Sequence, residues 1–129
     1  MTRKPCPANS GYCWALETVT VAPKSPRLLI GDFNTGLHFR DEVGKTFVHS
    51  DRFEQLGVLG WVDLWRRHNA ESEFTWYSRR RGGALGNGFR LDHAFGCPQL
   101  AARVQRCWYS HDEREAGLSD HSILMLDLD

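Results

Sequence analysis

The sequence predicts a single α/β domain, and three observations carry this prediction. Short apolar runs such as Leu28–Ile30 end at turn residues, which is typical of buried strands. Apolar residues at helical spacing, around 51–56 and 61–65, separate such runs. The chain has 129 residues, 41% hydrophobic and 25% charged, which suits one globular domain and argues against a disordered or fibrous class.

Each element is expected from its local pattern. The segment at 51–56 predicts a helix that starts at a Ser50 cap and ends at Gly57 or Gly60. Trp61, Leu64 and Trp65 are spaced as on one face of a second short helix. Aromatic and β-branched residues favour further strands at 74–78, 90–95, 104–110 and 122–129.

Two of these segments also predict exposure and burial. Residues 79–88 are rich in arginine and glycine, so we expect an exposed loop that joins two strands. The nearly continuous apolar run Ile123–Leu126 predicts a strand that is buried on both faces.

The ends of the chain and its charge restrict location and partners. Residues 1–25 show no periodicity and predict an N-terminal arm with a short helix or strand, while 26–129 form the domain. Sixteen basic and sixteen acidic residues cancel, so only a local patch could attract a polyanion. No run approaches the roughly 18 apolar residues of a membrane span, and no signal peptide is recognisable, so a cytoplasmic protein without a membrane partner is expected. The four cysteines lack zinc-site spacing and are expected to be free thiols.

Three acidic motifs point to chemistry: Gly31-Asp32-Phe33-Asn34, Arg90-Leu91-Asp92-His93 and Ser119-Asp120-His121. Each follows or ends a strand-like run, and strand ends are where α/β sheets build ligand sites. Carboxylates, a carboxamide and an imidazole together suit metal-assisted hydrolysis of a phosphoester. We expect a hydrogen bond from His121 to Asp92, because a carboxylate orients an imidazole in this way. An ion pair of Arg90 with Asp92 or Asp32 is the alternative.

A local basic region supports a polyanionic partner. Residues 66–90 contain six arginines and two glutamates, a local charge of +4. Arginines such as Arg81, with aromatic residues between them, can bind phosphates and stack on bases. A solvated surface loop is the alternative interpretation.

The three motifs, in this order, resemble those of the endonuclease/exonuclease/phosphatase superfamily, which includes exonuclease III and the abasic-site endonucleases. The resemblance implies direct hydrolysis of a phosphodiester with Mg²⁺ or Mn²⁺. It implies that Asp32 orients or deprotonates the attacking water and that Asn34 binds the phosphate. It further implies that Asp120 assists at the metal, and that His121, oriented by Asp92, contacts the phosphate or acts as base.

Residues 75–92 look most like the branch that acts on nucleic acid. There a Thr-aromatic strand leads to Asn-x-Gly-x-Arg-x-Asp, matched here by Asn87-Gly88-Phe89-Arg90-Leu91-Asp92 with one residue missing after Asn87. The resemblance implies a pocket for a base-free sugar. The substrate-binding residues that we expect are Trp76, Arg81, Asn87, Phe89, Arg90 and Leu91.

The resemblance covers only the second half of the family's domain. It implies half of a four-layer αββα sandwich: one mixed, mostly antiparallel sheet with helices on one face. The first half would carry the principal metal ligand, a glutamate. The sheet face left bare predicts a homodimer or a separate N-terminal half as partner.

Three functions therefore remain open from the sequence. The first is a metal-dependent phosphodiester hydrolase acting on DNA, as in DNA repair, truncated so that activity of the isolated chain is not expected. The second is a half-domain that binds nucleic acid or a protein without catalysis. The third is a phosphatase or phosphodiesterase of the same superfamily that acts on a small phosphoester.

Overall fold

The computed structural model describes residues 25–129, and its elements follow the expected α/β order. The strands are β1 (Leu28–Asp32), β2 (Val62–Asp63), β3 (Trp76–Arg79), β4 (Leu85–Phe89), β5 (Asp92–Gly96), β6 (Val104–Ser110) and β7 (Ile123–Leu128). The helices are α2 (Ser50–Val58), α3 (Leu64–His68), α4 (Pro98–Ala101) and α5 (Asp112–Glu115). The expected N-terminal arm lies almost wholly outside the described residues.

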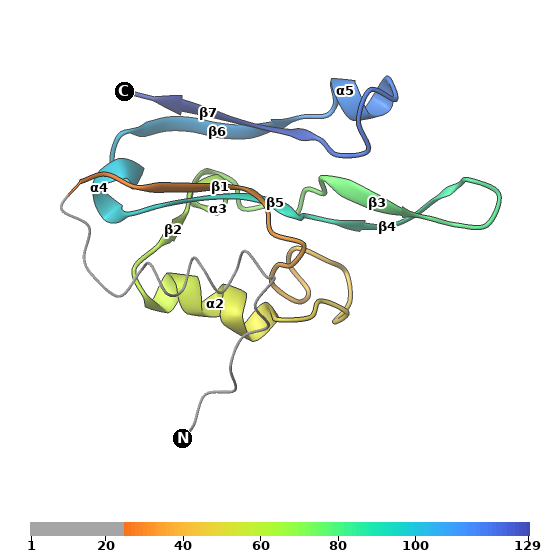
Figure 1. Ribbon diagram of the computed structural model, residues 1–129, viewed down its shortest axis with the longest axis horizontal. Coiled ribbons are helices and arrows are strands. Elements are labelled where there is room, and N and C mark those ends of the chain that lie inside the picture. The colour runs from red at the N-terminus through yellow and green to blue at the C-terminus, as the bar shows by residue number, and fades with distance from the viewer. Residues whose placement is uncertain (1–24) are drawn as a thin grey trace.

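Antiparallel pairing joins the strands into three ladders, in the orders β1-β5-β2, β3-β4 and β6-β7. Helix α2 lies on one side of β1 and β5, and the β6–β7 hairpin lies on the opposite side (Figure 1). The α/β class with antiparallel sheets and few helices is confirmed. None of the helices between residues 25 and 129 has the length and apolar character that a membrane crossing requires.

Two apolar clusters hold these layers together. The first lies under α2, where Phe53, Leu56 and Trp61 pack against Phe95 of β5. The second joins α3 and α4 to β5 and β6, and it consists of Leu64, Trp65, Ala94, Cys97, Leu100, Ala101, Val104, Cys107 and Tyr109. Within residues 25–129 both cysteines, Cys97 and Cys107, are buried free thiols, as expected. Strand β5 therefore sits at the centre of the fold, with Asp92 at its beginning.

The outer strands are less buried than their sequences predict. In β1, Leu28 is 36% and Ile30 51% exposed, and in β7, Ile123 is 41% and Met125 38% exposed. The expectation that these runs are fully buried is wrong, because β1 is an edge strand and only alternate residues of β7 pack inward. These apolar side chains lie on two different ladders among the described residues, and the partner expected to cover a bare sheet face stays a prediction.

Helix α2 also begins differently from the prediction. Ser50 is its first residue, and the Ser50 hydroxyl donates to the carbonyl of Gly36 at 2.7 Å instead of capping the helix. The preceding residue, His49, has φ 66° and makes no side-chain cap. Ser50 thus fastens the helix to the loop that follows β1.

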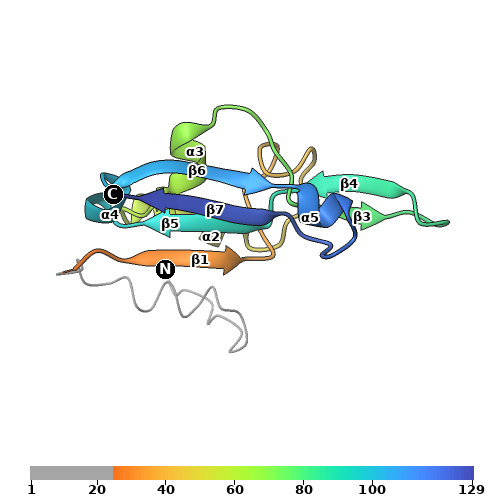
Figure 2. The same ribbon diagram turned by 90° about the horizontal axis from the view of Figure 1, so that it is seen from above.

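The glycine-rich segment is a hairpin arm where a loop was expected. Residues 85–89 form β4 and pair with β3, so only 80–84 remain as a turn. A Cβ added at Gly88 would lie 2.4 Å from a ring atom of Phe74, and one at Gly86 would meet the Ser78 hydroxyl. The glycines therefore permit close packing of this hairpin, which projects from the rest of the domain (Figures 1 and 2).

Candidate active site

The loop after β1 presents the first two predicted site residues. Asp32 ends the strand, and its Oδ1 accepts a hydrogen bond from the backbone N–H of Asn34 at 2.8 Å. Asn34 has φ 52°, a left-handed conformation that asparagine tolerates better than most residues. The buried His93 ring bonds through Nε2 to the carbonyl oxygen of Thr35 at 2.8 Å. The hydrogen bond from His93 thus fixes the backbone at Thr35, the residue that follows Asn34.

His121 stands between two carboxylates. Its Nδ1 lies 2.8 Å from Oδ2 of Asp92, and its Nε2 lies 3.9 Å from Oδ2 of Asp32. The side chains of His121, Asp92 and Asp32 are 26%, 13% and 37% exposed, so the group is open to a ligand. The expected contact between Asp92 and His121 is present in this geometry.

The carboxylates also change the protonation of the imidazole. Burial by itself would lower the pKa of His121, but the hydrogen bond to Asp92 and the charges of Asp92, Asp32 and Asp120 outweigh burial and raise it. Because Asp92 takes the proton on Nδ1, Nε2 is the nitrogen that faces Asp32. A protonated ring would offer a positively charged N–H donor at this position.

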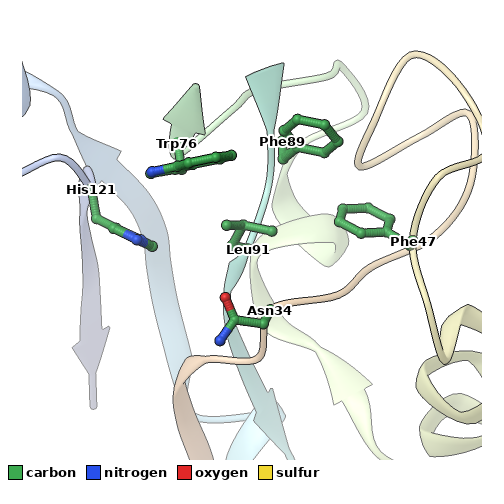
Figure 3. Close-up of a pocket in the computed structure, with 6 residues that line it drawn as sticks. All are labelled: Asn34, Phe47, Trp76, Phe89, Leu91 and His121. Carbon is green, nitrogen blue, oxygen red and sulfur yellow. The ribbon is translucent and has the colours of Figure 1, made fainter. Parts of the chain in front are cut away.

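A cavity of about 370 Å³ opens beside His121. Figure 3 shows its lining, which consists of Asn34, Phe47, Trp76, Phe89, Leu91 and His121. The Phe89 ring centre lies 5.9 Å from that of Trp76 and 5.6 Å from that of Phe47. The wall is therefore largely aromatic, and its polar side-chain groups come from Asn34, His121 and the indole N–H of Trp76.

Four predicted residues from the sequence motifs, Trp76, Phe89, Leu91 and Asn34, thus meet at one cavity together with His121. Phe47 was missed. It is a single aromatic residue in a loop without periodicity, so no local signal marks it. Arg81 and Asn87 are exposed on the hairpin and line no part of this cavity, and their substrate-binding roles stay predictions.

Arg90 is buried in the interior and lines no part of this cavity, and its substrate-binding role stays a prediction. Its side chain is fully buried, donates from Nε to Asp41 at 2.7 Å and bonds Asp63 from Nη2 at 2.5 Å. The guanidinium also stacks over Trp65, 4.7 Å from the ring centre. Its carboxylate partners are Asp41 and Asp63, neither of which was the expected Asp92 or Asp32.

This ion network includes Arg90, whose two neighbours in the chain, Phe89 and Leu91, line the cavity. The backbone N–H of Arg90 donates to the carbonyl of Asp41 at 2.7 Å, and Arg66 reaches the Asp41 carboxylate at 3.0 Å. Asp63 caps α3 by accepting from the backbone N–H of Arg66. The ion pair between Asp41 and Arg90 therefore links the loop that carries Phe47 to the residues just before β5.

The metal prediction does not fit the described residues by themselves. Asp120 is exposed and lines a second cavity, while Asp32 and Asp92 are directed to His121. Residues 25–129 contain no group of three or more histidine, cysteine or acidic side chains that could hold a metal ion. A divalent cation at this site would need further ligands from elsewhere.

Comparison with solved structures supports the resemblance seen in the motifs, because the matching structures are members of the endonuclease/exonuclease/phosphatase superfamily. An AP endonuclease from Archaeoglobus fulgidus matches 92% of this chain and 55% of its own, with a TM-score of 0.70 and 26% identity. No family model matches the sequence, and no curated protein matches it.

Two further matches come from Neisseria. The 3′ phosphatase NExo, solved with a product DNA hairpin, covers 81% of this chain and 45% of its own at 24% identity and a TM-score of 0.68. The 3′-5′ exonuclease NExo of Neisseria meningitidis gives the same identity and coverage with a TM-score of 0.66. The chain thus spans about half the length of the solved structures that it matches.

Proposed function

We propose that this chain provides the phosphate-reacting side of a phosphodiester hydrolase that acts on DNA. One observation carries the proposal: His121 lies between Asp92 and Asp32 and lines an aromatic cavity. The neighbours in structure support DNA as substrate, since one is an AP endonuclease and another was solved with a DNA product.

In this proposal His121 binds the reacting phosphate as a cation. Asp92 fixes the ring through Nδ1, which leaves Nε2 as the donor toward the ligand. The contact with Asp92 raises the pKa of His121 and so extends the pH range in which the ring is protonated, and a charged N–H stabilises the negative charge that grows on a phosphate oxygen. General base action by His121 would need the neutral ring, whereas phosphate binding uses the protonated ring that Asp92 and Asp32 stabilise.

Asp32 and Asn34 would complete the reaction. The Asp32 carboxylate lies 3.9 Å from Nε2 of His121, too long for a hydrogen bond and wide enough for a ligand oxygen to approach both groups. The exposed Asp32 is the group available to orient or deprotonate an attacking water. Asn34 lines the cavity and can donate its amide to a phosphate oxygen.

The shape of the cavity supports a sugar without a base as the group bound beside the phosphate. Trp76, Phe89 and Leu91 offer apolar faces to a ring but few partners for the polar edge of a base. A volume of about 370 Å³ lies at the small end of ligand pockets. Mg²⁺ or Mn²⁺ is the cofactor that the resemblance implies, with ligands beyond residues 25–129.

A nicking assay on duplex DNA with one abasic site tests the proposal. We expect Mg²⁺-dependent cleavage by the full chain, alone or mixed with the separately produced first half of a longer relative. His121→Gln and Asp32→Asn should abolish cleavage, while His68→Gln, an exposed histidine at the end of α3, should not. Wild-type protein that cleaves nothing under either condition would contradict the proposal.

Binding without catalysis is the second candidate function. It is favoured by the lack of a three-ligand metal group in residues 25–129 and by the exposed apolar side chains of β1 and β7. A homodimer or a separate first half would cover such a surface. Wild-type and Asp32→Asn protein that bind abasic DNA equally, without cleavage, would support this candidate over the first.

A further inference from the structure

A second cavity, of about 420 Å³, shares Trp76 with the first. Its other lining residues come from the β3–β4 hairpin and from the segment between α5 and β7: Tyr77, Arg79, Leu85, Arg114, Glu115, Gly117 and Asp120. The indole of Trp76 therefore contributes to two adjoining spaces, one beside His121 and one beside the two arginines.

Arg114 is held in place on one wall. Its guanidinium lies 4.9 Å from the centre of the Tyr77 ring, and its Nε donates to the Ser122 hydroxyl at 3.1 Å. Ser122 is buried and also bonds Nδ1 of His111 at 2.6 Å. No other hydrogen bond engages the Arg114 guanidinium within residues 25–129, so its terminal N–H groups can serve a ligand.

Arg79 supplies a second guanidinium from β3. The only hydrogen bond of this guanidinium within the described residues is a long one, 3.3 Å, to the carbonyl of Gly83 in the hairpin turn. Two guanidinium groups on one cavity suit a phosphate, because each presents several N–H donors. Aromatic faces beside them suit a base, which stacks on such rings.

Two carboxylates on the same cavity narrow the ligand class. Glu115 and Asp120 balance the charges of the two arginines, so a bare inorganic anion gains little from this cavity. A nucleotide gains more, because its phosphate accepts from arginine while amino groups of its base donate to a carboxylate. The lining thus matches the mixed charge of a nucleotide.

We propose that this second cavity is a subsite for the nucleotide next to the reacting phosphate, with Arg79 and Arg114 on its phosphate and the Trp76 and Tyr77 rings against its base. The inference rests on the proposed function, since it assumes a DNA strand that continues past the His121 cavity. Trp76 would then separate the base-free sugar on one side from an intact nucleotide on the other.

A titration of the ¹⁵N-labelled full chain with dAMP, followed by NMR, tests the subsite. We expect dAMP, up to about 10 mM, to shift the amide signals of Arg79 and Gly117 and the indole signal of Trp76, because weak millimolar binding is visible at that concentration. Inorganic phosphate at the same concentration should shift them much less.

Variants make the test specific. Arg79→Gln and Arg114→Gln should each weaken dAMP binding about tenfold, the usual effect of losing a charge-assisted hydrogen bond. Arg106→Gln is the matched control, because Arg106 also stacks on an aromatic ring, Trp108 at 4.1 Å, but lines neither cavity. In single-stranded DNA binding, each lost phosphate contact should reduce the salt slope by about 0.7.

The outcomes separate this inference from the proposed function. Shifts confined to Asn34 and Phe47, or equal shifts with dAMP and inorganic phosphate, would overturn the subsite even if abasic DNA is cleaved. Unchanged binding in both arginine variants would overturn it as well. Specific dAMP shifts without cleavage of abasic DNA would uphold nucleotide binding at this cavity and refute the hydrolase, so that the cavity could no longer be placed next to a reacting phosphate.

Discussion

Replacing Arg90 by methionine should strongly destabilise this fold, because the Arg90 guanidinium neutralises two carboxylates in its interior. The substitution keeps most of the length of the side chain and removes its charge. Asp63 loses both of its bonds to the guanidinium, and Asp41 loses the bond from Nε. Asp41 keeps Arg66 at 3.0 Å and the backbone N–H of Leu37, so the uncompensated charge falls mainly on Asp63.

The size of the effect follows from this burial. The side chains of Arg90 and Asp41 are fully buried and that of Asp63 is 17% exposed, so solvent screens the orphaned charges poorly. Removing one partner of a buried ion pair costs about 3–5 kcal/mol. The free energy of unfolding of a domain of this kind is about 5–15 kcal/mol, so roughly a third of it would be lost.

Urea unfolding followed by circular dichroism measures this loss. With a slope of about 1–3 kcal/mol per molar urea, the midpoint should fall by about 2 M. Arg103→Met is the control, because Arg103 is exposed and, within residues 25–129, its side chain bonds only the main-chain oxygen of Asp129, and it should change stability by about 0.5 kcal/mol or less. Equal midpoints for the two variants would refute the view that the Arg90 network holds the fold.

Two histidines and two glycines give three further tests. Burial lowers the pKa of His93 to about 4, so the unfolded chain binds more protons than the folded chain between pH 6.5 and 4. The free energy of unfolding should therefore fall by about 3 kcal/mol as the pH drops from 6.5 to 4. His93→Phe should flatten this pH profile in unfolding experiments. Asp92→Asn should lower the pKa of His121, and equal His121 pKa values in NMR titrations of the variant and the wild type would contradict the Asp92 contact. Gly88→Ala should destabilise the hairpin, because the new Cβ would overlap the Phe74 ring. Gly57→Ala in α2 has open space around its Cβ and should raise the free energy of unfolding by about 0.5–1 kcal/mol. Equal changes in melting temperature for the two variants would contradict the packing of Gly88.

The site could be predicted as far as each residue belonged to a short motif. Asp32, Asp92 and His121 meet because the ends of their strands lie at one edge of the fold. The apolar runs of the sequence indicate where those strands end. The ion partners of Arg90 were not predicted, because Asp41 and Asp63 lie 49 and 27 residues away and no local pattern encodes that distance. Phe47 was missed for the same reason.

The hairpin shows a different limit of prediction. Glycine is rare in strands because it packs poorly and loses much entropy on ordering. In β4 the opposite requirement holds, since Gly86 and Gly88 lie against Ser78 and Phe74 with no room for a Cβ. Propensity therefore favours a loop where close packing imposes a strand.

The projecting hairpin offers a readout of binding that requires no turnover. Its turn carries Arg80 and Arg81 beside two glycines with positive φ, all exposed, which is the kind of peptide that trypsin cuts first. A DNA strand lying along β3 and β4 would shield these peptide bonds. The time course of tryptic cleavage at the tip, with and without DNA, would then report occupancy even in a chain that hydrolyses nothing.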